Sequence, residues 1–486
     1  MGFFNYIGRH CLNIKNILCN TTIYSLYNIY NLINIIRLSG HIGLFYVHKR
    51  YTRTYSRYIL NNIIYNININ GYIFIKFTQW LTSRLLILCN NDEDRQILTI
   101  LEDIYENCHS HSIHETINMY KTDFNQNIFN DYKLCEMVGS GSIGQVYKGI
   151  DLNTKEIVAI KVKHYGIEYK YLISYFIIKI IIFIFWLFPC INYRVLPMKL
   201  NDFLDQLNSQ LDFNNEVHNC NIMYENFKDN DTVIVPKVLK HSNNIIVMTY
   251  EGGEDFDKLK ITEKKKLKIA LYFTLLIYKM SYSFGFLHGD LHKGNWKIQY
   301  SYDTGYFKII YYDFGYMLNI NNINMNKSLI ESMRYNLTKN ITHILLNNCI
   351  PISASENRYN EIYTIITNHI KPSTTITTHK FTKLALLIST KYRLLYNTEL
   401  INILLMLIQI EELCISNNIR QNDSLSYEDS INFQYKLNEE YIILCQTYKH
   451  YDDLLEYFTN LNNKYGLKKE VNNSMFSNIS YLENLS

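Results

Sequence analysis

Three polar side chains with the spacing of a phosphoryl-transfer site lie in residues 284–300, FGFLHGDLHKGNWKIQY. His288, Asp290 and Asn295 follow the pattern H-x-D-x-x-x-x-N of a kinase catalytic loop. In such a loop the Asp orients or deprotonates the acceptor hydroxyl, and the Asn holds a metal ion. Asp313 begins an Asp-Phe-Gly triplet after a predicted strand, where a kinase keeps a second Mg²⁺ ligand. Together these residues predict chemistry on a nucleotide phosphate.

A glycine-rich segment upstream could cover those phosphates. Residues 131–166 alternate like a hairpin with a turn at Asn153-Thr154, and the pattern G-x-G-x-x-G-x-V precedes VAIK. A dinucleotide-binding fold uses the same glycine spacing, but there the third glycine opens a helix, whereas here it runs into the strand-like QVYKGI. The hairpin is therefore favoured. The candidate nucleotide-binding residues are Gly139, Gly141, Ser142, Gly144, Val146 and Lys161.

Lys161 needs an acidic partner if it is to hold the α- and β-phosphates. Residues 200–227 have a helical apolar pattern that carries Asp212 and Glu216, and Glu216 is the candidate partner. The apolar run at 171–191 is long enough to cross a membrane, but a single crossing would place Lys161 and Glu216 on opposite sides. We therefore expect this run to form a buried or interfacial helix on the small lobe.

The sequence after Asp313 differs from that of an ordinary protein kinase. A protein kinase has a substrate-binding segment closed by A-P-E. Here no proline occurs between Pro236 and Pro351, and the residues after 319 pass almost directly into a helical pattern. We therefore expect the peptide-binding platform to be absent.

Composition excludes several other classes of function. The 486 residues are enough for a bilobal domain with an extension, and the net charge of +4 is too small to indicate a nucleic-acid partner. The ten cysteines include no C-x-x-C pair, so neither a structural zinc site nor a disulfide framework is expected. A reducing compartment fits this pattern.

The N-terminal region is basic and contains no acid before Asp92. Such a segment suits mitochondrial import or an anionic membrane surface, although codon drift in an AT-rich genome would produce it too. Residues 22–47 approach the length of a membrane span, but Arg37 and several Asn weaken that interpretation. A mitochondrial, membrane-associated location and a cytoplasmic one both remain open.

Roughly residues 70–330 resemble the UbiB-like atypical kinases, the aarF-domain group tied to isoprenoid quinone and lipid metabolism. The resemblance rests on KFTQ at 76–79, which is similar to the family's K-x-G-Q signature, on QLDFNNE at its E-x-D…E helix, on SGSIGQVYKG, and on HGDLHKGN. Thr78 and Gln210 depart from the signatures. The glycine-rich loop and the Gln-Leu-Asp sequence are similar to a mitochondrial branch of the family.

This resemblance implies an α+β fold with the two lobes of a protein kinase, Mg-ATP as cofactor, and a small-molecule or lipid-like acceptor. It also implies a lid over the active site built from Lys76, Gln79, Gln210 and Asp212, with Lys76 in salt-bridge reach of Asp212 or Asp313. His288 and His292 are expected to support the loop rather than bind metal. The expected division is a basic N-terminal segment (1–60), a helical extension (61–130), a small lobe (131–253) and a large lobe with C-terminal helices (254–486).

Overall fold

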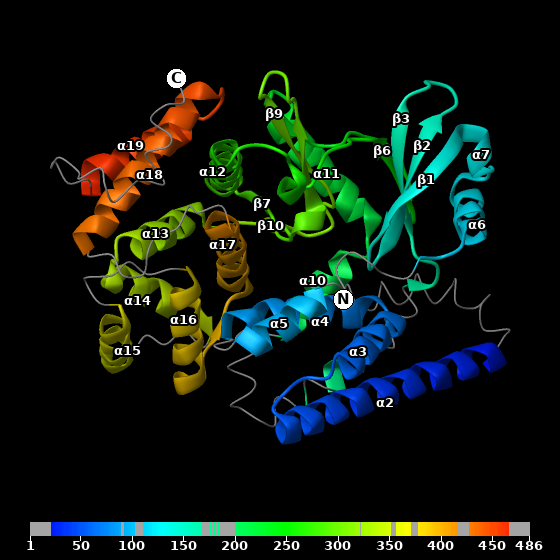
Figure 1. The fold of residues 1–486 in the computed structure, drawn as a ribbon, viewed down its shortest axis with the longest axis horizontal. Helices are drawn as coiled ribbons and strands as arrows, with labels where there is room; N and C mark the ends of the chain where they lie inside the picture. Colours follow the sequence, from blue (N-terminus) through cyan, green and yellow to red (C-terminus); the bar gives the residue numbers. More distant parts are fainter. Residues whose placement is uncertain are drawn as a thin grey trace.

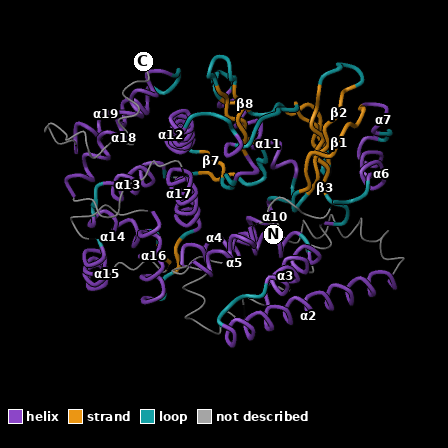
Figure 2. The backbone as a smooth tube through the Cα atoms, in the orientation of Figure 1, coloured by secondary structure: helices purple, strands orange, loops and turns teal. Residues whose placement is uncertain are grey.

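The computed structural model has the expected α+β, bilobal architecture, with a β-rich small lobe and a helical large lobe (Figure 1). Most strands lie in the sheet of the small lobe and in shorter groups near its boundary with the large lobe, and one short pair lies beside α16 (Thr378–Tyr392) (Figure 2). The structure describes residues 21–88, 92–102, 110–167, 175–176, 178–180, 183, 200–320, 322–350, 356–370, 378–416 and 427–465.

The small lobe is a five-stranded sheet in the order β1-β2-β3-β6-β5, and every pair in it is antiparallel. The strands are β1 (Tyr132–Ser140), β2 (Gly144–Asp151), β3 (Ile157–Lys163), β5 (Val238–His241) and β6 (Ile245–Thr249). β2 and β3 form the predicted hairpin, in which Asp151 accepts hydrogen bonds from the turn residues Asn153 and Thr154. One face of the sheet is a separate apolar core with α6 (Ile113–Phe124) and α7 (Ile128–Asp131) at its edge.

The region 200–227, expected as one helix, contains two. Helix α10 (Leu200–Ser209) ends before Gln210, and α11 (Phe213–Phe227) begins after Asp212. The Asp212 side chain accepts a hydrogen bond from the backbone N–H of Asn214, which satisfies an otherwise unpaired donor of the first turn of α11. This cap explains the break, because an N-cap residue has extended rather than helical backbone angles.

The large lobe is built on the buried helix α12 (Glu263–Lys279), which continues into a π-helical turn at Met280–Phe284. Beside it lie the pair β7 (Phe286–His288) with β10 (Met317–Asn319) and the group β4 (Val233–Ile234), β9 (Phe307–Tyr311) and β8 (Trp296–Tyr300). The chain passes from β10 to α13 (Ile323–Arg334), so the prediction of an almost direct entry into helix is confirmed.

Further helices complete the large lobe away from the small one (Figure 1). They are α14 (Thr338–Asn347), α15 (Glu356–His369), α16 (Thr378–Tyr392), α17 (Thr398–Ser416), α18 (Tyr427–Thr447) and α19 (Asp452–Tyr465), with a short pair of β11 (Cys349–Ile350) and β12 (Leu395–Tyr396). Most of the apolar run 171–191 lies outside the described residues. Within it Ile178 is fully buried in the main core, and Phe176 and Ile180 are exposed.

The N-terminal extension crosses the base of both lobes as α2 (Thr21–Thr52), α3 (Arg57–Asn70), α4 (Tyr72–Leu88) and α5 (Asp92–Glu102) (Figure 1). α4 is the helix of this group that enters the main core, through Tyr72, Ile73 and Phe77. Among the described helices, none combines the length and the apolar character required to span a membrane.

Candidate active site

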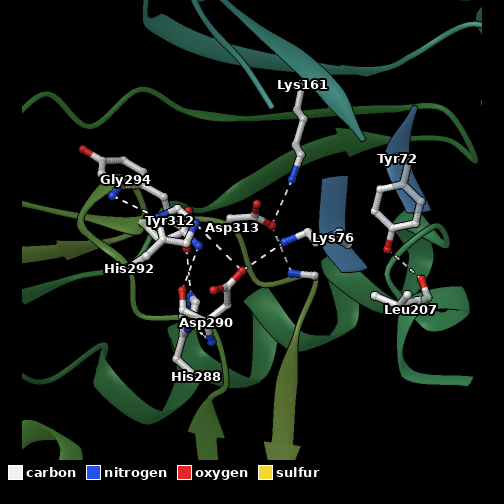
Figure 3. Close-up of polar contacts among 12 residues, drawn as sticks. Tyr72, Lys76, Lys161, Leu207, His288, Asp290, His292, Gly294, Tyr312 and Asp313 are labelled. Atoms are coloured by element: carbon white, nitrogen blue, oxygen red, sulfur yellow. Dashed lines mark hydrogen bonds and ion pairs between the residues drawn. The ribbon is translucent and has the colours of Figure 1, made fainter. Parts of the chain in front are cut away.

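Lys161 forms the centre of a buried ion network between the lobes. Its ammonium on β3 lies 2.5 Å from Oε1 of Glu216 and 3.2 Å from Oδ1 of Asp313, so the predicted pairing with Glu216 is present (Figure 3 shows the contact with Asp313). Burial alone would lower the pKa of Lys161, but the charges of Asp313 and Glu216 outweigh it and raise the pKa. Lys161 therefore remains a fixed cation at neutral pH.

Glu216 is held in place by the start of α11. It lies in the first turn, four residues after the Asp212 cap, and only 3% of the residue is exposed. Burial raises its pKa, which the charge of Lys161 opposes. Within the described part of the chain its Oε2 has no hydrogen-bond partner, and its ion pair is with Lys161. An acid buried in this way is costly unless it is paired, which makes Glu216 dependent on Lys161.

Asp313 occupies a backbone conformation that few side chains adopt. Its φ is 55°, and the backbone N–H of Gly315 donates to its Oδ1 at 3.3 Å. A Cβ on Gly315 would lie 3.2 Å from that same oxygen, which accounts for glycine at this position. Partial burial raises the pKa of Asp313, but Lys161 and Lys76 lower it strongly, so it is anionic. The side chain is 42% exposed and faces the cleft as a charged acceptor.

The catalytic loop is fixed by its own hydrogen bonds. The amide Nδ2 of Asn295 donates to the backbone carbonyl of Asp290 at 2.8 Å, and the backbone N–H of Asp290 donates to Nδ1 of His288 at 3.2 Å. Burial would raise the pKa of Asp290, but the charges of Lys76 and His292 lower it. Asp290 is thus an anion aimed into the cleft from a rigid loop (Figure 3).

The two loop histidines act as supports in the structure. Nε2 of His288 lies 2.9 Å from the Tyr312 carbonyl, which can only accept, so this nitrogen carries the proton and Nδ1 accepts from Asp290. Burial lowers the pKa of His288, which keeps the ring neutral. His292 caps the short helix Lys293–Asn295 by accepting from the N–H of Gly294. Neither ring is part of a cluster of three or more metal-binding side chains among the described residues.

The residues expected to hold Mg²⁺ fit a hard cation. Asp313 offers a charged oxygen in the cleft, and the amide nitrogen of Asn295 is used by the Asp290 carbonyl. The amide oxygen of Asn295 makes no hydrogen bond within the described part of the chain and is left to serve as a ligand. Mg²⁺ favours coordination by one or two protein oxygens, with water and phosphate oxygens in its remaining coordination positions.

Lys76 reaches the site from α4, but its partner differs from the prediction. Its ammonium pairs with Oδ2 of Asp290 at 3.0 Å, rather than with Asp212 or Asp313 (Figure 3). Asp212 is unsuitable because its carboxylate caps α11, and Asp313 is already paired with Lys161. Burial would lower the pKa of Lys76, but Asp290 and then Asp313 raise it. The lid cation therefore sits on the candidate catalytic base itself.

Two further residues of the expected lid are buried. The hydroxyl of Tyr72 donates to the Leu207 carbonyl at 2.8 Å and ties α4 to α10 (Figure 3). Gln79 on α4 is 8% exposed, and Gln210, in the break between α10 and α11, is 6% exposed. Helix α4 is therefore tied to the end of α10, just before the break that carries Gln210.

The glycine-rich loop is shaped by close backbone packing. A Cβ on Gly144 would lie 2.5 Å from the Val162 carbonyl oxygen, which no side chain could tolerate. Val146 is the direct cross-strand neighbour of both Gly139 and Lys161, so it shares the face of the sheet that carries Lys161. The turn residues Gly141 and Ser142 join β1 to β2 above this face.

Tyr316 is a site residue that the sequence analysis missed. A Cβ on Gly289 would lie only 2.8 Å from the Tyr316 ring, so the ring packs directly against this glycine. The Tyr316 hydroxyl donates to the side-chain oxygen of Gln206 on α10 at 3.0 Å. Tyr316 also lines a cleft of about 350 Å³. In the sequence, the glycine directly before Asp290 is a weak indication that a large side chain packs against this position. The cleft is lined by Gln206, Ser209, Asn215, Asn219, Gly315, Tyr316, Met317, Leu318, Asn319, Thr398, Glu399 and Asn402.

Comparison with known proteins places this geometry in a family. A family model described as the ABC1 atypical kinase-like domain matches residues 101–346. A probable serine/threonine-protein kinase abkC of Dictyostelium discoideum is 27% identical over 250 residues, which are 50% of this chain and 35% of that protein. The mitochondrial ABC1 family protein YPL109C of Saccharomyces cerevisiae is 28% identical over 256 residues, 46% of this chain and 37% of its own length.

Two further similarities are more distant. The chloroplastic protein ACTIVITY OF BC1 COMPLEX KINASE 1 of Arabidopsis thaliana is 28% identical over 205 residues, 39% of this chain and 28% of its own. A solved Rv3197–erythromycin complex from Mycobacterium tuberculosis aligns with a TM-score of 0.40 and 16% identity over 63% of this chain and 82% of that one. The chain thus spans about a third of the length of the curated relatives it matches. The predicted resemblance to UbiB-like atypical kinases is confirmed, and the chain belongs to the ABC1 atypical kinase-like family.

Proposed function

We propose that this protein is an atypical kinase or ATPase that binds Mg-ATP between its lobes and acts on a small-molecule or lipid-like acceptor, in isoprenoid quinone or lipid metabolism. The observation that carries the proposal is the ion pair of Lys76 with Asp290. A lid helix that contacts the catalytic carboxylate lies where a peptide substrate would have to approach it. Nucleotide binding is supported by the ion pairs of Lys161 and by the match to a kinase-like family model.

The site residues have separate roles in nucleotide binding, metal binding and proton transfer. Lys161 binds the α- and β-phosphates and is held by Glu216, while Gly139, Gly141, Ser142, Gly144 and Val146 cover the nucleotide. Asp313 and Asn295 would hold Mg²⁺, which supplies positive charge at the β- and γ-phosphates. Asp290 orients or deprotonates the acceptor hydroxyl or water, a role commonly worth about 10²- to 10⁴-fold in rate.

The cleft behind Tyr316 supports a neutral acceptor group rather than an anionic one. The described residues that line it include no Lys, Arg or His, and they supply several side-chain amides and one carboxylate, Glu399. Asn402 on α17 is only 7% exposed and makes no hydrogen bond within the described chain, so its amide is available from the cleft. Amide groups of this kind recognise hydroxyl or carbonyl groups.

An organellar site of action fits the relatives and the N-terminus. The proteins similar to this chain include a mitochondrial protein of yeast and two chloroplastic proteins of Arabidopsis thaliana. The acid-free N-terminal segment suits mitochondrial import and contact with anionic lipid. We therefore propose a mitochondrial location with peripheral contact to a membrane, and a cytoplasmic location as the alternative.

The decisive experiment measures Mg-ATP turnover by the purified chain with and without anionic liposomes. Asp290→Asn should abolish turnover and leave nucleotide binding largely intact, whereas Asp313→Asn should weaken Mg-nucleotide binding itself. Equal turnover in the wild type and both variants would refute the site assignment. Nucleotide binding without multiple-turnover ADP release would instead indicate a non-catalytic regulator.

A protein-kinase activity is the second candidate, because one relative is called a probable serine/threonine-protein kinase. The arrangement of α4 over Asp290 disfavours it. Labelling of peptides by the wild type but not by Asp290→Asn would establish it. No labelling alongside ATP turnover would favour the small or lipid-like acceptor.

A further inference from the structure

Two histidines that are distant in sequence meet beneath the glycine-rich loop. His111 precedes α6, and His164 follows β3 directly. Their Nδ1 atoms lie 2.9 Å apart, and Nε2 of His164 lies 2.9 Å from the carbonyl oxygen of Gly141. The hydrogen bonds that define the pair lead to the glycine-rich loop and to α6 rather than to the ion network of Lys161, so the phosphoryl-transfer site does not explain the pair.

The hydrogen bonds of this pair have a defined direction. The Gly141 carbonyl can only accept, so Nε2 of His164 carries a proton, and with a neutral ring its Nδ1 is an acceptor. Nδ1 of His111 must then donate to it, which leaves Nε2 of His111 as the acceptor for the Thr116 hydroxyl at 2.9 Å. Burial and the neighbouring His164 lower the pKa of His111 to about 4, although Glu115 opposes this, so His111 is neutral at pH 7.

The far end of the chain of hydrogen bonds is anchored in the sheet. Thr116 is fully buried and lies 3.1 Å from the Tyr147 hydroxyl, which accepts from the Gln145 amide. The same Gln145 side chain accepts from the backbone N–H of His111 and donates to the backbone carbonyl of His111. The backbone of His111 is therefore clamped to β2 by a buried side chain, and its ring has little freedom to turn.

The contact with Gly141 controls the orientation of a neighbouring N–H group. The Gly141 carbonyl and the Ser142 N–H belong to one planar trans peptide unit, so they point in opposite directions. When His164 holds that carbonyl, the peptide unit is prevented from flipping. The Ser142 N–H donates no hydrogen bond within the described part of the chain, whereas the Gly141 N–H is already used by the Gly144 carbonyl.

We propose that His164, fixed by His111, is a positioning residue that pins the Gly141–Ser142 peptide so that the Ser142 N–H faces the phosphates of Mg-ATP. This inference rests on the proposed nucleotide site and adds a role for the segment before α6. The relay runs in one direction from Gln145 through Tyr147, Thr116, His111 and His164 to the loop. It ties the segment before α6 to the phosphate-covering loop through polar contacts, in addition to the apolar packing of α6 on the sheet.

Two substitutions at His164 separate the two ends of its ring. The amide nitrogen of His164→Gln reaches about as far as Nε2 and can still donate to the Gly141 carbonyl. The shorter amide of His164→Asn matches the position of Nδ1 and keeps the contact with His111 but not with the loop. Both variants are neutral, so they differ mainly in whether the loop is held.

The test is a titration of the full chain with Mg-ATP by calorimetry, together with kcat and KM for ATP turnover. His164→Asn should raise Kd and KM for Mg-ATP about two- to tenfold, as expected for one neutral hydrogen bond, with little change in kcat. His164→Gln should stay within about twofold of the wild type. Thermal unfolding of both variants should match the wild type, because the contact lies at a loop.

The outcomes distinguish this inference from the proposed function. Wild-type protein that does not bind Mg-ATP would refute both. If the wild type and His164→Asn bind Mg-ATP with the same Kd, the relay is refuted and the nucleotide site is not. The same holds if His164→Gln and His164→Asn lose equal affinity for Mg-ATP. A fall in kcat at unchanged KM would also refute it, since the loop would then act on the chemical step.

Discussion

Replacing Lys76 by methionine tests whether the lid sets the protonation of the candidate base. Methionine has a similar length and no charge, so it removes the ion pair with Asp290 and retains most of the packing. The two charged atoms are 3.0 Å apart, and the side chains of Lys76 and Asp290 are only 14% and 24% exposed. Solvent screening of this pair is therefore weaker than for a surface pair.

The size of the effect follows from this distance. Coulomb's law at 3.0 Å gives an attraction of about 5 kcal/mol at an effective dielectric constant near 20 and about 1.4 kcal/mol in water. Part of this is offset by removing both charges from water, so a net difference of about 1.5 to 3 kcal/mol is reasonable. Loss of this attraction removes the main charge that lowers the pKa of Asp290, so the pKa of Asp290 should rise in Lys76→Met.

The sign of the pH dependence is defined by the lowered pKa of Asp290 in the folded protein. The stability that the ion pair contributes is present above the unfolded pKa of about 3.9 and is lost as pH falls through the folded value. For catalysis, Asp290 must be anionic. The acid limb of kcat/KM for ATP turnover should therefore move to higher pH in Lys76→Met.

The assay is a pH–rate profile of Mg-ATP turnover with three variants. Lys76→Arg keeps the charge and should retain the wild-type acid limb. Lys258→Met is the matched control, because Lys258 forms a surface pair with Asp255 and its side chain is 78% exposed. An acid limb that does not move in Lys76→Met, or that moves equally in Lys258→Met, would contradict the direct effect of the lid on Asp290.

Three further predictions follow from the site and its supports. Glu216→Gln should weaken Mg-ATP binding several-fold in calorimetry, because Lys161 would then pair with Asp313 alone and compete with the metal; unchanged affinity would count against this role. Gly144→Ala should lower stability in urea by about 1–3 kcal/mol because of the 2.5 Å approach to a carbonyl, whereas Gly141→Ala, with its nearest atom at 3.6 Å, should fold normally. Asp212→Ala should cost about 1 kcal/mol through the lost cap of α11 and Asp212→Asn much less, and equal losses would show that charge rather than capping matters.

The pairing of Lys161 with Glu216 could be predicted from sequence because it depends on the order of motifs along one fold. Strand β3 follows the glycine-rich hairpin, α11 follows β3, and their relative placement is common to kinase-like small lobes. The break before α11 could have been predicted as well. Asp212 followed by an apolar helical pattern is a start signal for a helix, and it was treated instead as part of a longer one.

The partner of Lys76 could not be predicted, because it depends on how α4 lies across the two lobes. A shift of one helical turn, about 5.4 Å, would have been enough to exchange Asp290 for a neighbouring carboxylate. The histidine pair was missed for a related reason. His111 and His164 are 53 residues apart, with no spacing that marks them as a unit, and they meet only because α6 packs at the edge of the sheet.

The charges of the site suggest why a lid cation lies on Asp290 at all. Three carboxylates, on Glu216, Asp290 and Asp313, share the cleft with two ammonium groups, on Lys76 and Lys161. Without Lys76, the ammonium of Lys161 would be the remaining positive charge beside Asp290 and Asp313. The repulsion between these two carboxylates would then raise the pKa of Asp290. Mg²⁺ at Asp313 and Asn295 would relieve the same repulsion. Under the proposed function, Lys76 and the metal would therefore be alternative sources of positive charge for one acidic site, and a variant that loses Lys76 should bind Mg²⁺ with altered affinity.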